Sequence, residues 1–148
     1  SLRAIIPTVV TQSLGDKTIN LGSLHPTRDL TYIDDTTDAF IAALNKKKDI
    51  GEIINIGSGF EISIKNLVTR ISKIIGRKLS IQQESLRERP KKSEVDRLKA
   101  NTKKAKKLLN WSPKLATKSA FNNSLKKTIN WFSQKENLNQ YKIDVLND

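Results

Sequence analysis

The chain has 148 residues, of which 36% are hydrophobic and 28% are charged. These values are typical of a folded domain with a buried core, and the uncharged apolar runs are too short to span a membrane. There is no cysteine and only one histidine, His25, which excludes thiol chemistry, disulfide bonds and multi-histidine metal sites. Arg3 and Pro7 interrupt the start of the chain, so no signal peptide is expected. We expect a cytoplasmic protein without a membrane segment or a metal site.

The net charge of +12 is concentrated in one segment. Residues 87–107 hold ten lysines and arginines against three acidic residues, which gives +7 of the total. No aromatic side chain is interleaved with these cations, whereas proteins that bind single-stranded nucleic acid usually combine the two. We therefore expect no nucleic-acid partner. A solvated lysine surface and an anionic small-molecule site at the arginines both stay open.

The first third of the chain predicts two helices and two extended segments. Apolar spacing predicts a helix that begins near Pro7, or is kinked there, with Gly15 just beyond its end. The extended segments are predicted at 17–21 and 30–33. Asp34 or Asp35 is expected to cap the second helix. Its predicted apolar face consists of Ala39, Phe40, Ala43 and Leu44.

The remainder alternates strands and helices. Strands are predicted at 52–57, a β-branched run that ends in a glycine turn, and at 79–83. The clearest helix covers 64–75, with Ser63 as its N-cap and Gly76 just beyond its end. Further helices are predicted from Thr102 to Leu109 and over 118–135. A polar tail over 136–148 is expected to fray, which leaves one domain over 1–135 of α/β class.

Familiar catalytic motifs are absent from the sequence. Gly57-Ser58-Gly59 follows a predicted strand, but no third glycine completes a dinucleotide fingerprint, so a simple turn is expected. There is no Walker sequence, and neither tyrosine has a lysine four residues later. The aspartates at 29, 34, 35 and 38 are interpreted as capping and first-turn residues rather than as a metal site. His25, beside Pro26, is expected to be an exposed turn residue.

Three arginines are better candidates for function. Arg28, Arg87 and Arg89 lie at loop or element-end positions near prolines, where binding groups are often found. A guanidinium group binds phosphate in a bidentate manner, and two or three together match a diphosphate. Composition alone also allows these to be separate surface arginines.

Four segments resemble, in the same order, the extended short-chain dehydrogenases that act on nucleotide sugars. Residues 28–35 (RDLTYIDD) are similar to that family's R-D-[aromatic]-x-Y-V-x-D segment. AIIP at 4–7 resembles the start of a helix after the nucleotide-sugar loop. EIINIGSG at 52–59 resembles the Y-N-I-G-S-G strand. The last segment, from RP at 89–90 through EVD at 94–96 to KAK and LNWSP, resembles R-P-x-E-V-D…K-A-[K]-x-x-L-G-W-x-P.

The resemblance implies a role for each matching residue. Arg28 and Arg89 are expected to hold the substrate diphosphate, with Arg87 adding a phosphate contact and Glu94 contacting the ribose or base. Ile6 and Pro7 are expected to line the base pocket. The resemblance further implies that Asp29 orients Arg28 and that Tyr32 supports the domain junction. Asn110 stands where the family usually has glycine.

The glycine-rich dinucleotide loop and the Tyr-x-x-x-Lys pair of such enzymes do not occur in this sequence. The resemblance therefore implies that this chain is the C-terminal, substrate-binding portion of the fold, and that it consists of a small sheet with packed helices. Most of the dinucleotide-binding core would be missing from it. No catalytic residue is expected in this chain, and the isolated chain is expected to be inactive. NAD or NADP would serve the parent enzyme.

Within the family, the segments look most like sugar-nucleotide 4,6-dehydratases of the legionaminic and GDP-mannose types. The expected substrate is a UDP- or GDP-linked sugar, and a homo-oligomer is expected. Two alternatives remain. One is a 4-epimerase or reductase of the same family, and the other is a non-catalytic basic module that binds or oligomerises.

Overall fold

The computed structural model describes residues 4–46, 51–87, 93–114 and 116–140. The chain divides into two compact units, and each is described by itself. The first unit comprises Ser1–Pro26, Ser63–Asp96 and Leu125–Asp148, and the second comprises Thr27–Ile62 and Arg97–Ser124.

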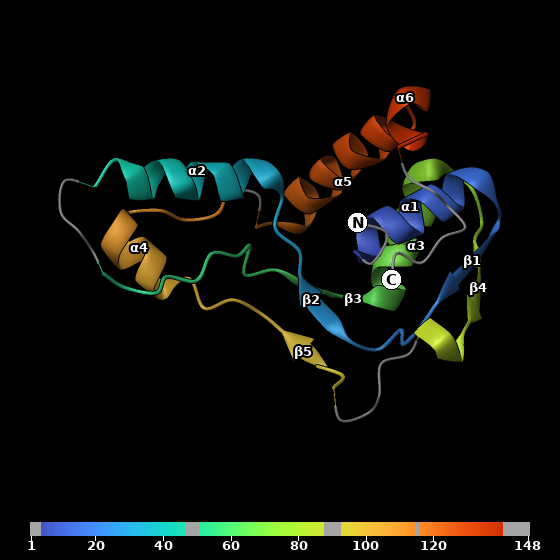
Figure 1. Ribbon diagram of the computed structural model, residues 1–148, viewed down its shortest axis with the longest axis horizontal. Helices are drawn as coiled ribbons and strands as arrows, with labels where there is room; N and C mark the ends of the chain where they lie inside the picture. Colours follow the sequence, from blue (N-terminus) through green and yellow to red (C-terminus); the bar gives the residue numbers. More distant parts are fainter. Residues whose placement is uncertain (1–3, 47–50, 88–92, 115, 141–148) are drawn as a thin grey trace. The chain divides into compact units, whose positions relative to one another are not determined.

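The first unit is built on two parallel strands with helices packed beside them (Figure 1). Strands β1 and β4 pair in register from Thr18 opposite Ser80 to Leu21 opposite Gln83. Its elements are α1 (Ile5–Gly15), β1 (Thr18–Leu21), α3 (Ile64–Ile75), β4 (Ser80–Gln83), the 3₁₀ turn η1 (Ser85–Arg87) and α6 (Lys135–Leu138). Both strands were predicted from the sequence to within one residue at each end.

Helix α1 is confirmed, with Pro7 in its first turn, where a missing N–H costs no intrahelical hydrogen bond. The prediction that Gly15 lies just beyond the helix is wrong, because Gly15 is its last residue and the N–H of Asp16 donates to the carbonyl of Gln12. The side-chain amide of Gln12 forms two hydrogen bonds with the backbone of Asn20, as a neighbouring strand would. It accepts from the N–H of Asn20 at 2.6 Å and donates to the carbonyl of Asn20 at 3.2 Å.

Helix α3 has both predicted caps. The Ser63 hydroxyl accepts from the N–H of Asn66 at 3.2 Å, and Gly76 adopts the left-handed conformation with φ 71°. Its apolar side chains Ile64, Leu67, Val68 and Ile71 are buried, and they join residues from α1, β1 and the second half of α5 in the core of this unit. These core residues are Val9, Val10, Ile19, Leu21, Leu67, Val68, Ile71, Leu125, Ile129 and Phe132.

The second unit contains a small three-stranded sheet in the order β3-β2-β5, with β2 and β5 parallel. Its elements are β2 (Thr27–Asp29), α2 (Ile33–Leu44), β3 (Glu61–Ser63), β5 (Arg97–Leu98), α4 (Lys103–Leu109) and the first half of α5 (Lys118–Phe132). The last residue of β3, Ser63, belongs to the first unit, as does the second half of α5.

Helix α2 differs from its prediction at both its cap and its exposed face. It begins at Ile33 after Tyr32, whose side chain forms no capping hydrogen bond, so neither Asp34 nor Asp35 is the cap. Ala39 is buried as predicted, but Phe40 is 68% exposed and Leu44 is 82% exposed. Apart from Ala39, the side of the helix that was predicted to be buried is therefore exposed.

Two predicted strands differ from the structure, one in its position and the other in its conformation. The strand expected at 30–33 is β2, three residues earlier, because Thr27 and Arg28 pair with Arg97 and Leu98. The segment 52–57 is not hydrogen-bonded as a strand. Its Ile54 and Ile56 are instead partly buried against a cluster formed by α2, α4 and the turn that follows α4, namely Ala39, Ala105, Leu109 and Trp111.

Helices α4 and α5 were predicted correctly in type and approximate length. The tail prediction needs a correction at its start, because Lys135–Leu138 form the short helix α6. Residues 141–148 lie outside the described part of the chain, and the expected domain end at 135 stays a prediction. The α/β class with small sheets and packed helices is confirmed.

Asn110 ends α4 in the left-handed conformation, with φ 56°. Asparagine tolerates this region better than other non-glycine residues. We predict that Asn110→Gly leaves the free energy of unfolding unchanged or raises it. Asn110→Ala should lower it by about 1 kcal/mol, because a Cβ without a compensating polar group is strained there. Urea denaturation of the three proteins measures both changes, and equal stability of the Ala and Gly variants would contradict the expectation.

Candidate functional site

The side chain of Asp29 joins three segments of the second unit. Its Oδ1 accepts from the backbone N–H and the hydroxyl of Ser58, at 2.8 Å and 2.5 Å. Its Oδ2 accepts from the N–H of Gly59 at 2.9 Å and of Ala100 at 3.2 Å. Asp29 therefore fixes the backbone of the Gly57–Gly59 turn and of Ala100, and its expected role in orienting Arg28 stays a prediction.

Gly57 lies where these segments approach most closely. A Cβ at this position would collide with the Cβ of Ala100 and would lie 2.9 Å from Oδ2 of Asp29. The glycine is therefore required by the close packing of the Gly57–Gly59 turn against β2 and the chain after β5.

The sheet places Arg28 and its neighbours on two different faces. Thr27 is opposite Arg97 and Arg28 is opposite Leu98 in the β2–β5 pair. Because side chains alternate along a strand, Thr27, Asp29 and Arg97 share one face, and Arg28 and Leu98 share the other. Arg28 is half-buried, and its Nη1 donates to the carbonyl of Thr27 at 2.8 Å. Leu98 is 59% exposed beside it.

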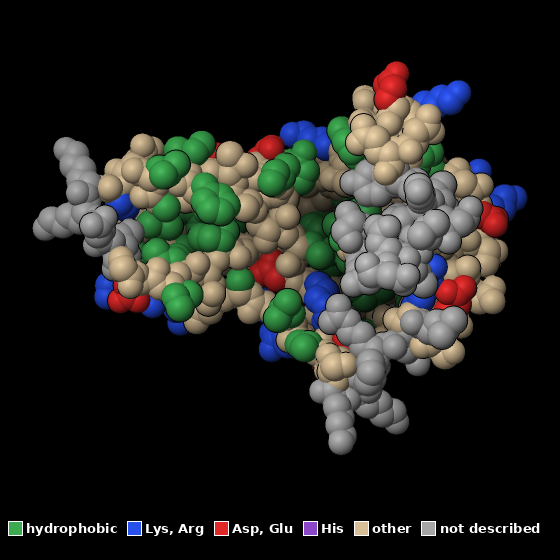
Figure 2. Space-filling model, in the orientation of Figure 1, with side chains coloured by type: hydrophobic (Ala, Val, Ile, Leu, Met, Phe, Trp, Pro, Cys, Tyr) green, Lys and Arg blue, Asp and Glu red, His purple; other side chains and the backbone are tan. Residues whose placement is uncertain are grey.

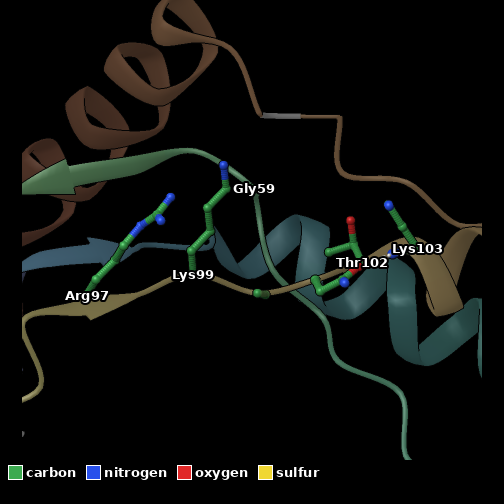
Figure 3. Close-up of a pocket in the computed structure, with 7 residues that line it drawn as sticks. Gly59, Arg97, Lys99, Thr102 and Lys103 are labelled. Carbon is green, nitrogen blue, oxygen red and sulfur yellow. Dashed lines mark hydrogen bonds between the residues drawn. The ribbon is translucent and has the colours of Figure 1, made fainter.

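The face that carries Arg97 borders an open pocket of about 580 Å³. Arg97 and Lys99 point from the β5 segment toward the chain at Gly59, and Thr102 and Lys103 lie at the start of α4 (Figure 3). Ala100 and Asn101 complete the lining. Three cations and two neutral polar side chains give the pocket a positive character.

Arg97 is partly neutralised by a carboxylate on β3, the strand on the other side of β2. Its Nη2 lies 2.8 Å from Oε2 of Glu61, and Nε donates to both carboxylate oxygens. The hydrogen bond with Arg97 lowers the pKa of Glu61, an effect that outweighs the opposing effect of burial. The same pair raises the pKa of Arg97. Arg97 therefore remains charged and is held in place at the edge of the pocket.

A second aspartate of the 28–35 segment fixes another distant loop. Asp35 is 1% exposed, and its Oδ1 accepts from the N–H of Lys114 at 2.9 Å. The ammonium group of Lys114 pairs with Asp38, and this hydrogen bond raises the pKa of Lys114. The expectation that Asp35 serves as a helix cap is therefore replaced by a tertiary role, in which α2 fixes the chain that follows Trp111.

The remaining predicted site residues belong to the first unit, apart from Tyr32, which precedes α2. Ile6 and Pro7 are half-buried in the first turn of α1. Arg87 ends η1, and its Nε lies 2.6 Å from Oε2 of Glu84. The carboxylate of Glu94 accepts from the N–H of Val95 at 3.1 Å. Arg89 lies outside the described residues, so its pairing with Arg28 as a diphosphate clamp stays a prediction.

The Gly57–Gly59 turn does not fit a dinucleotide. A glycine loop binds pyrophosphate through free backbone N–H groups, but the N–H groups of Ser58 and Gly59 donate to Asp29. Within the described ranges, no cluster of three or more acidic or histidine side chains could hold a metal ion. None of the described helices is long and apolar enough to cross a membrane. His25 is exposed, as expected, and lies 3.0 Å from Asp96.

Comparison with known proteins identifies the family. A model of the family described as GDP-mannose 4,6 dehydratase matches residues 1–124. The chain belongs to this family. It is 39% identical over 113 residues to a UDP-glucuronate 4-epimerase of Thermodesulfobacterium geofontis, a match that covers 75% of this chain and 31% of the relative. It is 31% identical over 136 residues to a UDP-N-acetyl-alpha-D-glucosaminuronate decarboxylase of Bacillus cytotoxicus, covering 90% and 41%.

Solved structures agree with this family assignment. The UDP-glucuronic acid 4-epimerase of Bacillus cereus, in complex with UDP-glucuronic acid and NAD, superposes with a TM-score of 0.78 at 32% identity. The match covers 90% of this chain and 40% of that structure. The resemblance to extended short-chain dehydrogenases is therefore confirmed. The chain spans well under half the length of these family members.

Three residues at or beside the pocket were not selected as candidates from the sequence, namely Glu61, Arg97 and Lys99. The alternation of Arg97, Leu98 and Lys99 is a strand signal, but two hydrogen-bonded residues are too few for a periodicity to stand out. The contact from Asp29 to Ser58 spans 29 residues, and the contact from Asp29 to Ala100 spans 71. No local pattern encodes pairings at such separations.

We predict that Asp29→Asn lowers the free energy of unfolding by roughly 2–3 kcal/mol, because an amide places N–H donors against other donors. Hydrogen exchange at the amides of Ser58, Gly59 and Ala100 should also accelerate. The control is Asp16→Asn, which keeps an oxygen acceptor for its exposed turn and should change little. Unchanged exchange at all three amides would contradict the role given to Asp29.

The Glu61–Arg97 pair predicts a dependence on pH. A carboxyl group whose pKa is lower in the folded than in the unfolded protein contributes stability above its ordinary pKa, and this contribution disappears as the pH falls through the lowered pKa. Arg97→Gln should return the pKa of Glu61 toward its ordinary value, as measured by carbon NMR of the carboxyl group. Lys104→Gln is the matched control, because it should raise the pKa of Glu52 and leave that of Glu61 unchanged.

Proposed function

We propose that this chain binds the diphosphate of a sugar nucleotide as the C-terminal part of an NAD(P)-dependent sugar-nucleotide 4,6-dehydratase. The observation that carries the proposal is the position of Arg28. It lies on β2 next to Asp29, whose four hydrogen bonds fix this strand against the Gly57–Gly59 turn and Ala100. A guanidinium group on so constrained a backbone is preorganised to bind an anion.

Family membership supports the same class of ligand. The superposable epimerase of Bacillus cereus binds UDP-glucuronic acid and NAD, and another neighbour, from Thermotoga maritima, was solved with UDP-glucose. In our proposal Arg89 is the second cation of the clamp, Arg87 adds a phosphate contact, and Glu94 contacts the ribose or base. Ile6 and Pro7 border the base, and Tyr32 supports the junction as the residue that precedes α2.

The cofactor is assigned to a different part of the parent enzyme. NAD or NADP would supply the hydride chemistry, but the Gly57–Gly59 amides are already engaged by Asp29 and this sequence contains no complete glycine fingerprint. The proposed role of this chain is therefore to recognise and orient the nucleotide sugar. The isolated chain is proposed to be inactive.

A 4-epimerase is the second candidate activity, favoured by the 39% identity to a UDP-glucuronate 4-epimerase, whereas the matching family model favours the dehydratase. In the family that the sequence resembles, an acidic residue beside the catalytic Ser or Thr marks a dehydratase. The genomic sequence upstream of this region tests the choice. A non-acidic residue at that position would favour the epimerase.

We predict that UDP- or GDP-linked sugars, but not NAD, raise the melting temperature of the chain. Arg28→Ala should weaken sugar-nucleotide binding at least about tenfold in calorimetry, because a charge-assisted hydrogen bond contributes roughly 1.5–3 kcal/mol. Arg89→Ala should have a similar effect. Lys99→Ala is the control, because Lys99 lines the pocket on the opposite face of the sheet and its loss should leave the affinity unchanged. Equal affinity of the Arg28→Ala variant and the original chain would refute the site.

A further inference from the structure

The pocket beside β5 is built almost entirely from one short piece of chain. Residues 97–103 supply six of its seven lining residues, and Gly59 supplies the seventh. The side chains of Arg97, Lys99, Thr102 and Lys103 extend from this piece of chain to the same side (Figure 3). Cationic and neutral polar groups therefore converge on one space, and the proposed sugar-nucleotide residues do not contribute to it.

The positive charge around the pocket exceeds the negative charge that balances it. Residues 97–107 contain six lysines and arginines and no acidic residue. Glu61 pairs with Arg97, and the pKa of Glu61 is lowered by this hydrogen bond and, to a smaller extent, by the charge of Lys99. In the part of the chain that the structure describes, neither Lys99 nor Lys103 forms an ion pair. Two ammonium groups at the pocket are therefore available to an anion.

Further hydrogen-bond donors at the pocket are also available. Glu61 contacts Nε and Nη2 of Arg97, and Nη1 has no acceptor among the described residues. The hydroxyl of Thr102 forms no capping hydrogen bond with α4. Asn101 uses its Oδ1 to accept from the N–H of Lys103 at 3.1 Å, which leaves its amide nitrogen to donate elsewhere. This set of donors can bind both an oxyanion and the hydroxyl groups of a ligand.

The polarity of the pocket is that of a solvent-facing site rather than of a surface covered by protein. The side chain of Arg97 is 68% exposed, and Lys99 and Lys103 are exposed. Lysine and arginine side chains lie along the edge that carries β5 and α4, whereas hydrophobic side chains gather over α2 (Figure 2). Protein that covered unpaired ammonium groups would have to supply acidic groups of its own, because burying an unpaired charge is unfavourable. A soluble anion supplies that charge directly.

We propose that this pocket is a second anion site, which binds a small phosphorylated compound on the face of the sheet opposite to Arg28. Its phosphate group would be held by Arg97, Lys99 and Lys103, and hydroxyl groups on its body would be held by Asn101 and Thr102.

The size and composition of the pocket define the class of this ligand. The volume of about 580 Å³ lies within the roughly 300–1,000 Å³ that is usual for small-molecule sites, and it exceeds what a phosphate ion fills. None of the lining residues is aromatic, so the pocket offers no surface on which a nucleobase would stack. The expected ligand is therefore a phosphorylated, hydroxyl-rich compound without a base, which distinguishes this site from the one proposed at Arg28.

NMR of the ¹⁵N-labelled 148-residue chain tests the proposal. Titration with inorganic phosphate at constant ionic strength should shift the amide signals of Gly59 and of residues 99–103 in a saturable manner. Glucose 6-phosphate should bind several-fold more tightly than inorganic phosphate, because its hydroxyl groups reach Asn101 and Thr102. Glucose, which lacks the charge, should cause no shift at the same concentrations.

Matched variants test the residues. Lys99→Ala and Lys103→Ala should each weaken the binding of glucose 6-phosphate about five- to tenfold, a loss moderated by the exposure of both side chains. Lys106→Ala is the control, because it removes the same charge from α4 at an exposed position that does not line the pocket. It should change the affinity by less than about twofold. Arg28→Ala should leave this affinity unchanged. Amide signals far from the pocket show whether each variant is folded.

Four results would overturn the proposal. Shifts that never saturate, or that chloride reproduces at equal ionic strength, would show only the general attraction of a basic surface. An equal loss of affinity in Lys106→Ala would have the same meaning. Loss of binding in Arg28→Ala would place the phosphate at the proposed diphosphate site instead. Absence of binding to the parent enzyme, expressed from the upstream reading frame, would show that the rest of the fold covers the pocket.

Discussion

The second unit depends on the carboxylate of Asp29, which accepts hydrogen bonds from Ser58, Gly59 and Ala100. Its sheet is too short to be stable through strand pairing, because β2 and β5 share only two paired positions. A half-buried charge with several donors can order backbone where a ladder of main-chain hydrogen bonds is missing. The glycine turn, the chain after β5 and the strand that carries Arg28 are therefore coupled to one acidic side chain.

A similar arrangement recurs six residues later. Asp35 uses a buried oxygen to hold the N–H of Lys114, and Asp38 pairs with the ammonium group of the same lysine. The RDLTYIDD segment thus spaces two aspartates so that one fixes the sheet and the other fixes the loop after Trp111. Arg28, which begins the segment, lies on strand β2, and the hydrogen bonds of Asp29 fix that strand in place. One short segment therefore both carries the proposed ligand-binding arginine and organises the unit around it.

The sequence predicted the elements that are stabilised locally, and it failed where tertiary contacts decide. Helix α3 carries its own caps and a complete apolar face, so both its bounds were predicted correctly. The exposed face of α2 was predicted to be buried because periodicity shows that a helix has an apolar side but not which of two apolar sides is covered. The run at 52–57 has the β-branched composition of a strand, yet strand pairing requires a neighbour that no local pattern reveals. Arg28 and Asp29 could be selected as candidate site residues from the family motif, but the hydrogen bonds of Asp29 to Ser58, Gly59 and Ala100 could not be predicted from it.

The packing around Gly57 has a consequence for how substitution data on this family should be interpreted. Any side chain at this position must displace either the Cβ of Ala100 or the carboxylate of Asp29. The displacement would pass through β2 to Arg28, on the other face of the sheet. A variant at Gly57 could then weaken the ligand binding proposed for Arg28, although Gly57 itself would not contact the ligand. Such an effect would be indirect, because it would reach Arg28 through a shift of strand β2. Substitution data alone would therefore wrongly suggest that Gly57 contacts the ligand.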